Sequence, residues 1–253
     1  MDLVWADPAA NRARAEEALE EIFSSCPDGS GPDLAVLPEM FSTGFATLPE
    51  GIAEKCPSTT LEWMKDAAAR FGCALAGSIA MQEGERFVNR FCFVKPDGQV
   101  TTYDKKHLFT FGGEHHRFAA GTERVTVQWR EVRFLPIICY DLRFPVWSRC
   151  RGDYDAIICV ASWPQVRRTA WDTLLRARAI ENQCYVLAVN RTGDDPSCHY
   201  NGGSAVIGPL GQTLAACPDG RHGWTVCELD MEQLGSFRKS FPALEDADQF
   251  TLE

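Results

Sequence analysis

Short apolar runs recur along the sequence, and segments with helical periodicity separate them. Each run is bounded by polar or turn-forming residues and is too short for a core helix, which favours a buried strand. The runs lie at residues 33–40, 73–80, 131–139, 155–162 and 184–190. Because buried strands that alternate with helices pack in layers, the pattern predicts an α/β fold with a mixed sheet.

Three segments have the pattern of amphipathic helices. Residues 9–25 place Ala, Leu and Ile at helical spacing, with charged residues between them. A second helix is expected near Thr59, because Thr59 and Glu62 have the spacing of a capping box, and Gly72 stands where a helix end needs a left-handed residue. Residues 166–183 predict a long third helix.

Turn signals predict two hairpins and a short helix. Residues 87–104 contain two apolar runs joined by a Pro-Asp-Gly turn. Residues 204–216 predict a second hairpin, and residues 223–230 predict one further strand beside it. The short helix is expected near residues 145–151.

Composition limits the classes of partner. The chain has 253 residues and a net charge of −10, which argues against a broad phosphate-binding surface and a nucleic-acid partner. No apolar run approaches the roughly 20 residues that span a bilayer, and the first residues do not resemble a signal peptide. We therefore expect a cytoplasmic protein without a membrane partner, folded as one domain over residues 1–253.

The eleven cysteines show no C-x-x-C pair and no regular framework, which argues against a zinc site or a disulfide scaffold. Most of them lie in apolar runs, where a reduced thiol packs as a small hydrophobic group. Glu114, His115 and His116 could be a fragment of a metal site, but no third ligand has suitable spacing. We expect no metal.

Three polar residues share one kind of position. Glu39, Lys105 and Cys139 each lie where an expected strand gives way to a loop, and such strand ends gather at one edge in α/β folds. A carboxylate in apolar surroundings can serve as the base for a thiol, and an ammonium group can favour a thiolate and stabilise an oxyanion. Each residue taken alone could instead be a solvated loop residue or a core thiol.

The segments around these residues resemble a known family. "VLPEMFSTGF", "YDKKHLF" and "ICYDLRFPVWSR" are similar to the three catalytic blocks of the nitrilase (carbon-nitrogen hydrolase) superfamily, in the same order. The resemblance covers nearly the whole chain and is greatest to the bacterial ω-amidase branch, whose enzymes hydrolyse 2-oxoglutaramate. It implies an α-β-β-α sandwich with mixed sheets, a homodimer and no cofactor.

The resemblance also implies catalytic roles. Cys139 would be the nucleophile and Glu39 the general base. Lys105, rather than Lys106, would stabilise the oxyanion, because the family lysine stands two residues before the histidine. Glu114 fits a second family glutamate, which would position the lysine or the substrate.

The substrate implied by the resemblance is a small amide with a remote carboxylate. The backbone N–H of Tyr140 would donate to the oxyanion, and Arg143 could bind the carboxylate as a bidentate fork. Phe41, Tyr140 and Trp163 are candidates for an apolar wall. A structural salt bridge for Arg143 and core packing for the aromatic residues remain open alternatives.

Two further alternatives concern the whole chain. The same catalytic residues would serve an N-carbamoyl amino acid amidohydrolase, an aliphatic amidase or a nitrilase. Members of the family usually open with a short apolar strand before the segment that here begins at Leu3, and the sequence does not contain it. We therefore expect exposed backbone groups in the sheet, and a catalytically silent, truncated interaction domain is the remaining alternative.

Overall fold

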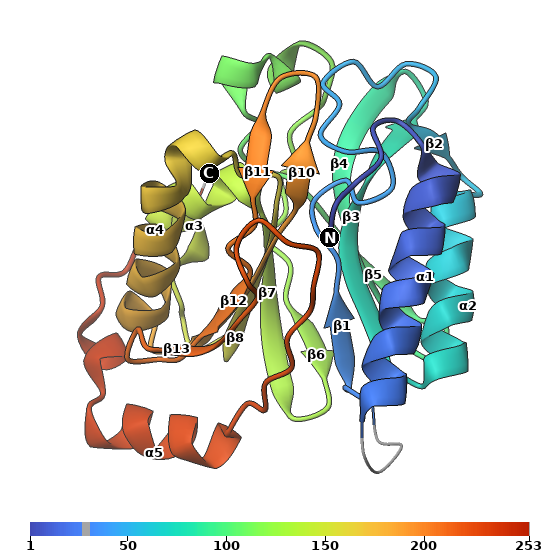
Figure 1. Cartoon of the computed structure of the whole chain (residues 1–253). Coiled ribbons are helices and arrows are strands. Elements are labelled where there is room, and N and C mark those ends of the chain that lie inside the picture. The colour runs from blue at the N-terminus through green and yellow to red at the C-terminus, as the bar shows by residue number, and fades with distance from the viewer. Residues whose placement is uncertain (27–30, 253) are drawn as a thin grey trace.

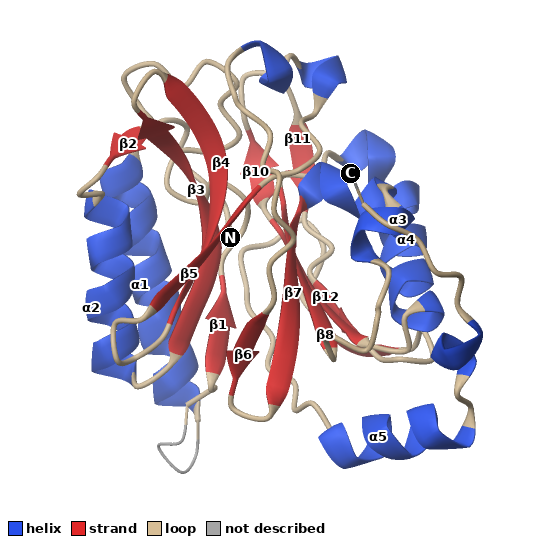
Figure 2. Cartoon of the chain, turned by 180° about the vertical axis from the view of Figure 1, so that it is seen from behind, coloured by secondary structure: helices blue, strands red, loops and turns tan. Residues whose placement is uncertain are grey.

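A computed structural model describes residues 1–26 and 31–252. Two β-sheets pack face to face, and helices cover the outer face of each (Figures 1 and 2). The arrangement is the predicted α-β-β-α sandwich. No helix in the described ranges is long and apolar enough to cross a membrane.

The first sheet has five strands and lies beneath α1 and α2. Its strands are β1 (Leu34–Val36), β2 (Glu54–Lys55), β3 (Ala74–Glu83), β4 (Arg86–Val94) and β5 (Val100–Asp104). The path runs β1-β3-β4-β5, with β2 also paired to β3. β1 runs parallel to β3, whereas β4 and β5 are antiparallel and form the hairpin predicted from the Pro-Asp-Gly turn.

The second sheet has six strands in the order β13-β12-β9-β8-β7-β6. They are β6 (Val127–Trp129), β7 (Val132–Ile138), β8 (Ala156–Ala161), β9 (Tyr185–Asn190), β12 (Ala205–Ile207) and β13 (Thr213–Ala216). The central strands β7, β8 and β9 are parallel and mostly buried, and β8 is buried at every residue, as expected for continuous apolar runs. Strands β10 (Thr192–Asp194) and β11 (His199–Asn201) form a separate antiparallel pair.

Four of the helices lie where the sequence predicts them, whereas α5 was not predicted. α1 (Pro8–Ser25) and α2 (Thr59–Phe71) pack on the first sheet, and α3 (Pro145–Ser148) and α4 (Arg168–Glu181) on the second, with α5 (Met231–Ser240) at one end (Figure 1). The side chain of Ser58, not of Thr59, caps α2 by accepting from the N–H of Leu61. Gly72 ends the helix at a φ of 63°, as predicted.

The main hydrophobic cluster fills the space between the two sheets and continues to the buried residues of α4. Phe91 and Phe93 of β4 face Phe134 of β7, and the ring centroids of Phe93 and Phe134 are 6.1 Å apart. A second cluster joins α1 and α2 to β3 and β4. Both sheets are thus fixed by buried packing, which positions the loops at their strand ends.

The prediction of a strand at residues 223–230 is wrong, because the structure has no strand in this segment. Among the described residues, β1 is paired only to β3, and residues of β1 line a common, mainly apolar cavity with residues 223–227. A strand needs the backbone groups of a neighbour, so an alternating apolar pattern without one does not make a sheet.

Candidate active site

The loop after β1 carries Glu39 into the space between the sheets. The chain continues along β3 beyond the strand end, since the N–H of Leu37 donates to the carbonyl of Ala76 at 2.7 Å. The N–H of Met40 donates to the hydroxyl of Ser78 at 2.8 Å, and Met40 holds a positive φ of 43°. This tight bend leaves the Glu39 side chain fully buried.

Lys105 lies between two buried carboxylates. It follows β5 directly, and its Nζ is 2.8 Å from Glu39 Oε1 and 3.0 Å from Glu114 Oε2. The exposed fraction of all three side chains is 0%. We call Glu39, Lys105 and Glu114 the charged cluster.

Hydrogen bonds hold both carboxylates in place. Asn89 Nδ2 donates to Glu39 Oε1 at 2.9 Å and to Glu114 Oε1 at 3.3 Å. The N–H of Ser162, which follows β8, donates to Glu39 Oε2 at 2.8 Å, and the N–H of Phe109 donates to Glu114 at 2.6 Å. Buried charges of this kind are tolerated only when paired and hydrogen-bonded.

Cys139 begins a 3₁₀ turn, Cys139–Arg143, directly after β7. Its φ is 46°, in the left-handed region that non-glycine residues rarely adopt, a type of strain that is concentrated at functional sites. Cys139 is half-buried, and its Sγ lies 4.0 Å from the carbonyl of Ser162. It borders the same cavity as Lys105.

The electrostatics of the site keep the thiol protonated. Burial raises the pKa of Cys139 well above its usual value, and the charge of Glu39 raises it further, against an opposing contribution from Lys105. Lys105 was expected to favour the thiolate, but these two effects outweigh it. A base must therefore remove the proton when the thiol reacts.

The cluster itself is strongly coupled. Burial opposes charge on Lys105, but the carboxylates of Glu114 and Glu39 outweigh it and raise the pKa of the ammonium group. Burial, together with the charge of Glu39, raises the pKa of Glu114 against the effect of Lys105. The lysine therefore stays charged at neutral pH, as an oxyanion donor must.

A second buried network fixes the loop that carries Cys139. Asp141 accepts from the hydroxyl of Tyr103 at 2.7 Å and from the N–H of Ile138 at 3.0 Å. Its other oxygen accepts from the N–H of His107 at 2.9 Å and lies 2.8 Å from His107 Nδ1. Asp141 thus ties the loop after β7 to the loop after β5, where Lys105 lies.

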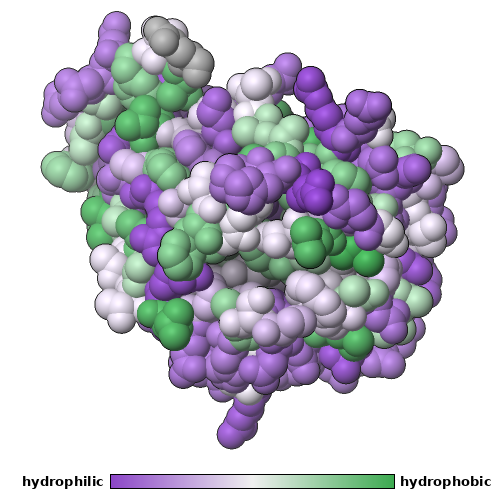
Figure 3. Space-filling model, turned by 90° about the horizontal axis from the view of Figure 1, so that it is seen from above, coloured by the Kyte–Doolittle hydropathy of each residue, from purple (hydrophilic) through white to green (hydrophobic). Residues whose placement is uncertain are grey.

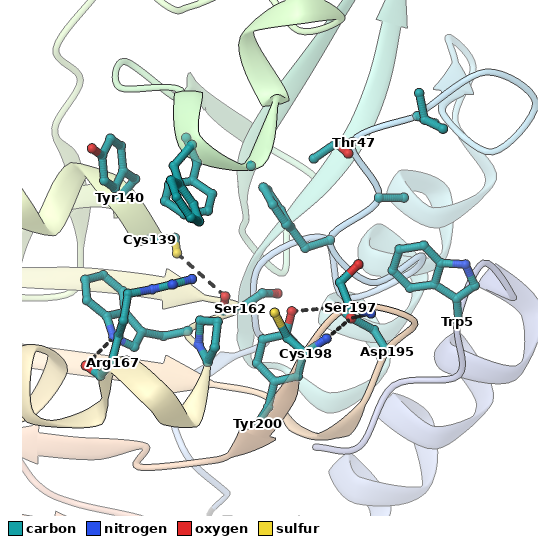
Figure 4. A pocket seen from close by; sticks show the side chains of 18 of the residues that line it. Trp5, Thr47, Cys139, Tyr140, Ser162, Arg167, Asp195, Ser197, Cys198 and Tyr200 are labelled. Atoms are coloured by element: carbon teal, nitrogen blue, oxygen red, sulfur yellow. Dashed lines mark hydrogen bonds between the residues drawn. The ribbon is translucent and has the colours of Figure 1, made fainter.

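A cavity of about 650 Å³ opens beside Cys139. It lies at the end of the sandwich near β10 and β11, which Figure 3 views from above, with apolar and polar side chains interspersed on this face. In the view of Figure 4, Cys139, Tyr140 and Arg167 lie on one side of the cavity and Trp5 and Thr47 on the other. The volume suits a small organic molecule.

The comparisons with known proteins identify the family. Residues 1–239 match the model of the carbon-nitrogen hydrolase family. The chain belongs to this family. It is therefore a hydrolase, and its relatives place it among the amidases of the nitrilase superfamily.

Three relatives of this carbon-nitrogen hydrolase are similar to it over nearly their whole length. It is 44% identical to the omega-amidase YafV of Yersinia enterocolitica, over 99% of this chain and 95% of the relative. It is 45% identical to the omega-amidase YafV of Escherichia coli K12, over 99% and 95%, and 34% identical to the 2-oxoglutaramate amidase of Bacillus subtilis, over 97% and 94%.

Among solved structures, XC1258 from Xanthomonas campestris, described as a CN-hydrolase superfamily protein with an arsenic adduct in its active site, has a TM-score of 0.93 and 41% identity. The match covers 100% of this chain and 96% of that one. Nit3 of Saccharomyces cerevisiae has a TM-score of 0.84 and 28% identity, over 95% and 91%. Both similarities extend the family assignment to the fold.

Most, but not all, of the residues predicted to bind substrate lie at the cavity of this hydrolase. Tyr140, Arg143 and Trp163 line it. Phe41 does not: it is fully buried beneath α2, where its ring centroid is 5.9 Å from that of Trp63. The expectation of a substrate-facing Phe41 is corrected, and Phe45 lies at the cavity instead.

Sequence reasoning missed the supporting residues of this hydrolase, although two of them carry a signal. Asn89 interrupts an otherwise apolar strand, and Asp141 follows the candidate nucleophile within an apolar run. The contact of Ser162 with the Glu39 carboxylate comes from its backbone N–H, while its hydroxyl donates to the Glu39 carbonyl at 3.4 Å, so the side-chain pattern does not reveal the carboxylate contact. Within the described ranges, no group of three His, Cys, Asp or Glu side chains is arranged to hold a metal ion.

Proposed function

We propose that this hydrolase is a cysteine-dependent ω-amidase that converts 2-oxoglutaramate, and its shorter analogue 2-oxosuccinamate, to the 2-oxo dicarboxylic acid and ammonia. The observation that carries the proposal is the buried Lys105, held between Glu39 and Glu114 beside a thiol that faces the cavity. The names of the relatives, omega-amidase and 2-oxoglutaramate amidase, support the substrate.

In the first half-reaction, Sγ of Cys139 attacks the amide carbon while Glu39 accepts the thiol proton. The carbonyl oxygen becomes an oxyanion, to which Lys105 and the backbone N–H of Tyr140 donate. Glu39 then returns the proton to the amide nitrogen, the C–N bond breaks, and ammonia leaves. The acyl group remains on Cys139 as a thioester.

In the second half-reaction, Glu39 takes a proton from a water molecule that attacks the thioester carbon. The oxyanion forms again beside Lys105, the C–S bond breaks, and the proton on Glu39 returns to the sulfur of Cys139. Glu114 pairs with the ammonium group of Lys105 in addition to Glu39, so the donor stays in position through both steps.

Arg143 supports a substrate with a carboxylate. Its guanidinium carbon lies 4.8 Å from the ring centroid of Trp163, at the cavity. The alternative of a structural salt bridge is not supported, since no carboxylate in the described part of the chain pairs with this side chain. An unpaired cation at a cavity wall suits the remote carboxylate of 2-oxoglutaramate.

Ammonia release from a panel of substrates tests the proposal. The panel contains 2-oxoglutaramate, 2-oxosuccinamate, an N-carbamoyl amino acid and a simple nitrile. We expect the two oxo-acid amides to be hydrolysed most efficiently, and Arg143→Ala to raise KM for 2-oxoglutaramate far more than for a neutral aliphatic amide. A preference for the carbamoyl compound or the nitrile, or equal effects of Arg143→Ala on both amides, would reject the assignment.

Two finer predictions accompany this function. We propose that the hydrolase acts as a homodimer in the cytoplasm, as the family resemblance implies. Sedimentation equilibrium would test the dimer, and a single species at the mass of one chain, 28.1 kDa, would contradict it.

A further inference from the structure

We propose that Arg167 completes an anion clamp with Arg143, so that the cavity selects amides whose far end carries a carboxylate. The sequence argument assigned no role to Arg167. The proposal rests on the proposed amidase function for the identity of the substrate, but it makes a separate claim about charge recognition in the cavity.

Arg143 and Arg167 differ from the other partly buried arginines of the described chain in their hydrogen-bond and ion-pair partners. Within the described ranges, every other arginine that is at least partly buried forms an ion pair with a carboxylate or donates to a carbonyl oxygen. Arg178, for example, donates to Glu181 at 2.9 Å and to the carbonyl of Leu142 at 2.6 Å. The guanidinium groups of Arg143 and Arg167 have no such acceptor among the residues that the structure describes, and both residues line the cavity beside Cys139.

Aromatic rings hold both guanidinium groups. The guanidinium carbon of Arg167 lies 5.2 Å from the ring centroid of Phe109, and that of Arg143 lies 4.8 Å from the ring centroid of Trp163. A ring face orients a cation without offering it a hydrogen-bond acceptor. The N–H groups of both arginines therefore remain available to the oxygens of a bound anion.

The backbone of Arg167 is fixed. It ends the 3₁₀ turn Gln165–Arg167 before α4, and its carbonyl accepts from Trp163 Nε1 at 2.8 Å (Figure 4). Trp163 thus binds the backbone of one arginine through its N–H and contacts the guanidinium of the other with its ring. This shared tryptophan couples the positions of the two cations.

The charge balance of the site calls for such a clamp. The charged cluster carries one net negative charge when its members are ionised, and the chain has a net charge of −10, so an anionic substrate meets repulsion. Asp195 also lines the cavity, but it accepts from its own loop and from Tyr200 at 2.6 Å rather than from either arginine. Two unpaired guanidinium groups offset this repulsion where the substrate binds.

Arg168 provides a matched control. It is adjacent to Arg167 but pairs with Asp172 at 2.8 Å and Asp219 at 2.9 Å, and it does not line the cavity. We would measure kcat and KM of the wild type, Arg167→Gln and Arg168→Gln with 2-oxoglutaramate and with pentanamide, a neutral amide with the same number of carbons. The loss of charged hydrogen bonds should lower kcat/KM of Arg167→Gln for 2-oxoglutaramate about 10- to 100-fold, mainly through KM.

Arg167→Gln should lose far less kcat/KM with pentanamide than with 2-oxoglutaramate, and Arg168→Gln should behave as the wild type with both amides. An equal loss with both amides would mean that Arg167 only supports the structure, and no loss with 2-oxoglutaramate would mean that it does not contact the anion. Either outcome overturns the clamp.

A binding measurement separates the clamp from the amidase function. Titration calorimetry with 2-oxoglutarate, the product dianion, should give a dissociation constant about 10- to 100-fold weaker for Arg167→Gln than for the wild type and Arg168→Gln. If no amide is hydrolysed but this difference is found, the clamp stands and the amidase proposal fails. If 2-oxoglutaramate is hydrolysed but all three proteins bind the dianion equally, the clamp fails and the amidase proposal stands.

Discussion

Replacement of Glu39 by Gln should slow amide hydrolysis but make the thiol of Cys139 easier to ionise, and it should also destabilise the fold. Oε1 accepts from Asn89 and Lys105, and Oε2 accepts from the N–H of Ser162. An amide can accept on one side only, so its NH₂ group would face an N–H donor on the other. This mismatch should lower the free energy of unfolding by about 1–3 kcal/mol.

Amide hydrolysis should fall steeply in this variant. A positioned general base accelerates a reaction about 10²- to 10⁴-fold, so kcat should drop by this factor, equivalent to about 3–5 kcal/mol in the activation barrier. The thiol should become easier to ionise, because the negative charge of Glu39 is one cause of the raised pKa of Cys139. Lys105, whose charge lowers this pKa, remains.

The assay is alkylation of Cys139 by iodoacetamide as a function of pH, followed by mass spectrometry of the peptide that contains it. In Glu39→Gln, the pH profile should move to lower pH and the rate at neutral pH should rise, while ammonia release falls. The exposed thiol of Cys56 is the internal control, and its rate should not change. Hydrolysis by Glu39→Gln at the wild-type rate, or an alkylation profile of Cys139 that moves to higher pH, would refute the proposed roles of Glu39.

Two further predictions concern the buried charges. Lys105→Met leaves the carboxylates of Glu39 and Glu114 without their cation. It should therefore abolish hydrolysis and lower the free energy of unfolding, measured in urea, by about 3–5 kcal/mol. Unchanged stability would contradict the role of the ion pairs. Asp141→Asn keeps the size of the side chain but replaces an oxygen that accepts from Tyr103 and Ile138, or from His107. This variant should lower the free energy of unfolding by about 1–3 kcal/mol and reduce kcat by displacing the Cys139 loop. A fully active, equally stable variant would show that the network does not position the loop.

The sequence predicts those features that depend on local pattern and strand order. Glu39, Lys105 and Cys139 each end an apolar run, and the structure brings these strand ends together between the two sheets. Asn89 reaches both carboxylates only because β4 pairs in register with β3, opposite Ala80. That register is set by the whole hairpin, so the segment alone could not reveal the contact.

Long-range packing decides the remaining differences. Phe41 lies two residues after Glu39, but the bend at Met40 turns it into the core beneath α2. Residues 223–230 have the composition of a strand, yet the described chain offers them no partner. Arg143 and Arg167 face one cavity only because the turns after β7 and β8 meet, since these strands are parallel neighbours.

The central claim is that Cys139 forms a thioester with the substrate. Rapid mixing with 2-oxoglutaramate, followed by an acid quench and intact-mass measurement, tests it most directly. The account predicts a transient adduct of the acyl group, located on the peptide that contains Cys139 and absent from a folded Cys139→Ala protein that releases no ammonia. Ammonia release by Cys139→Ala, or an adduct on another residue, would contradict it.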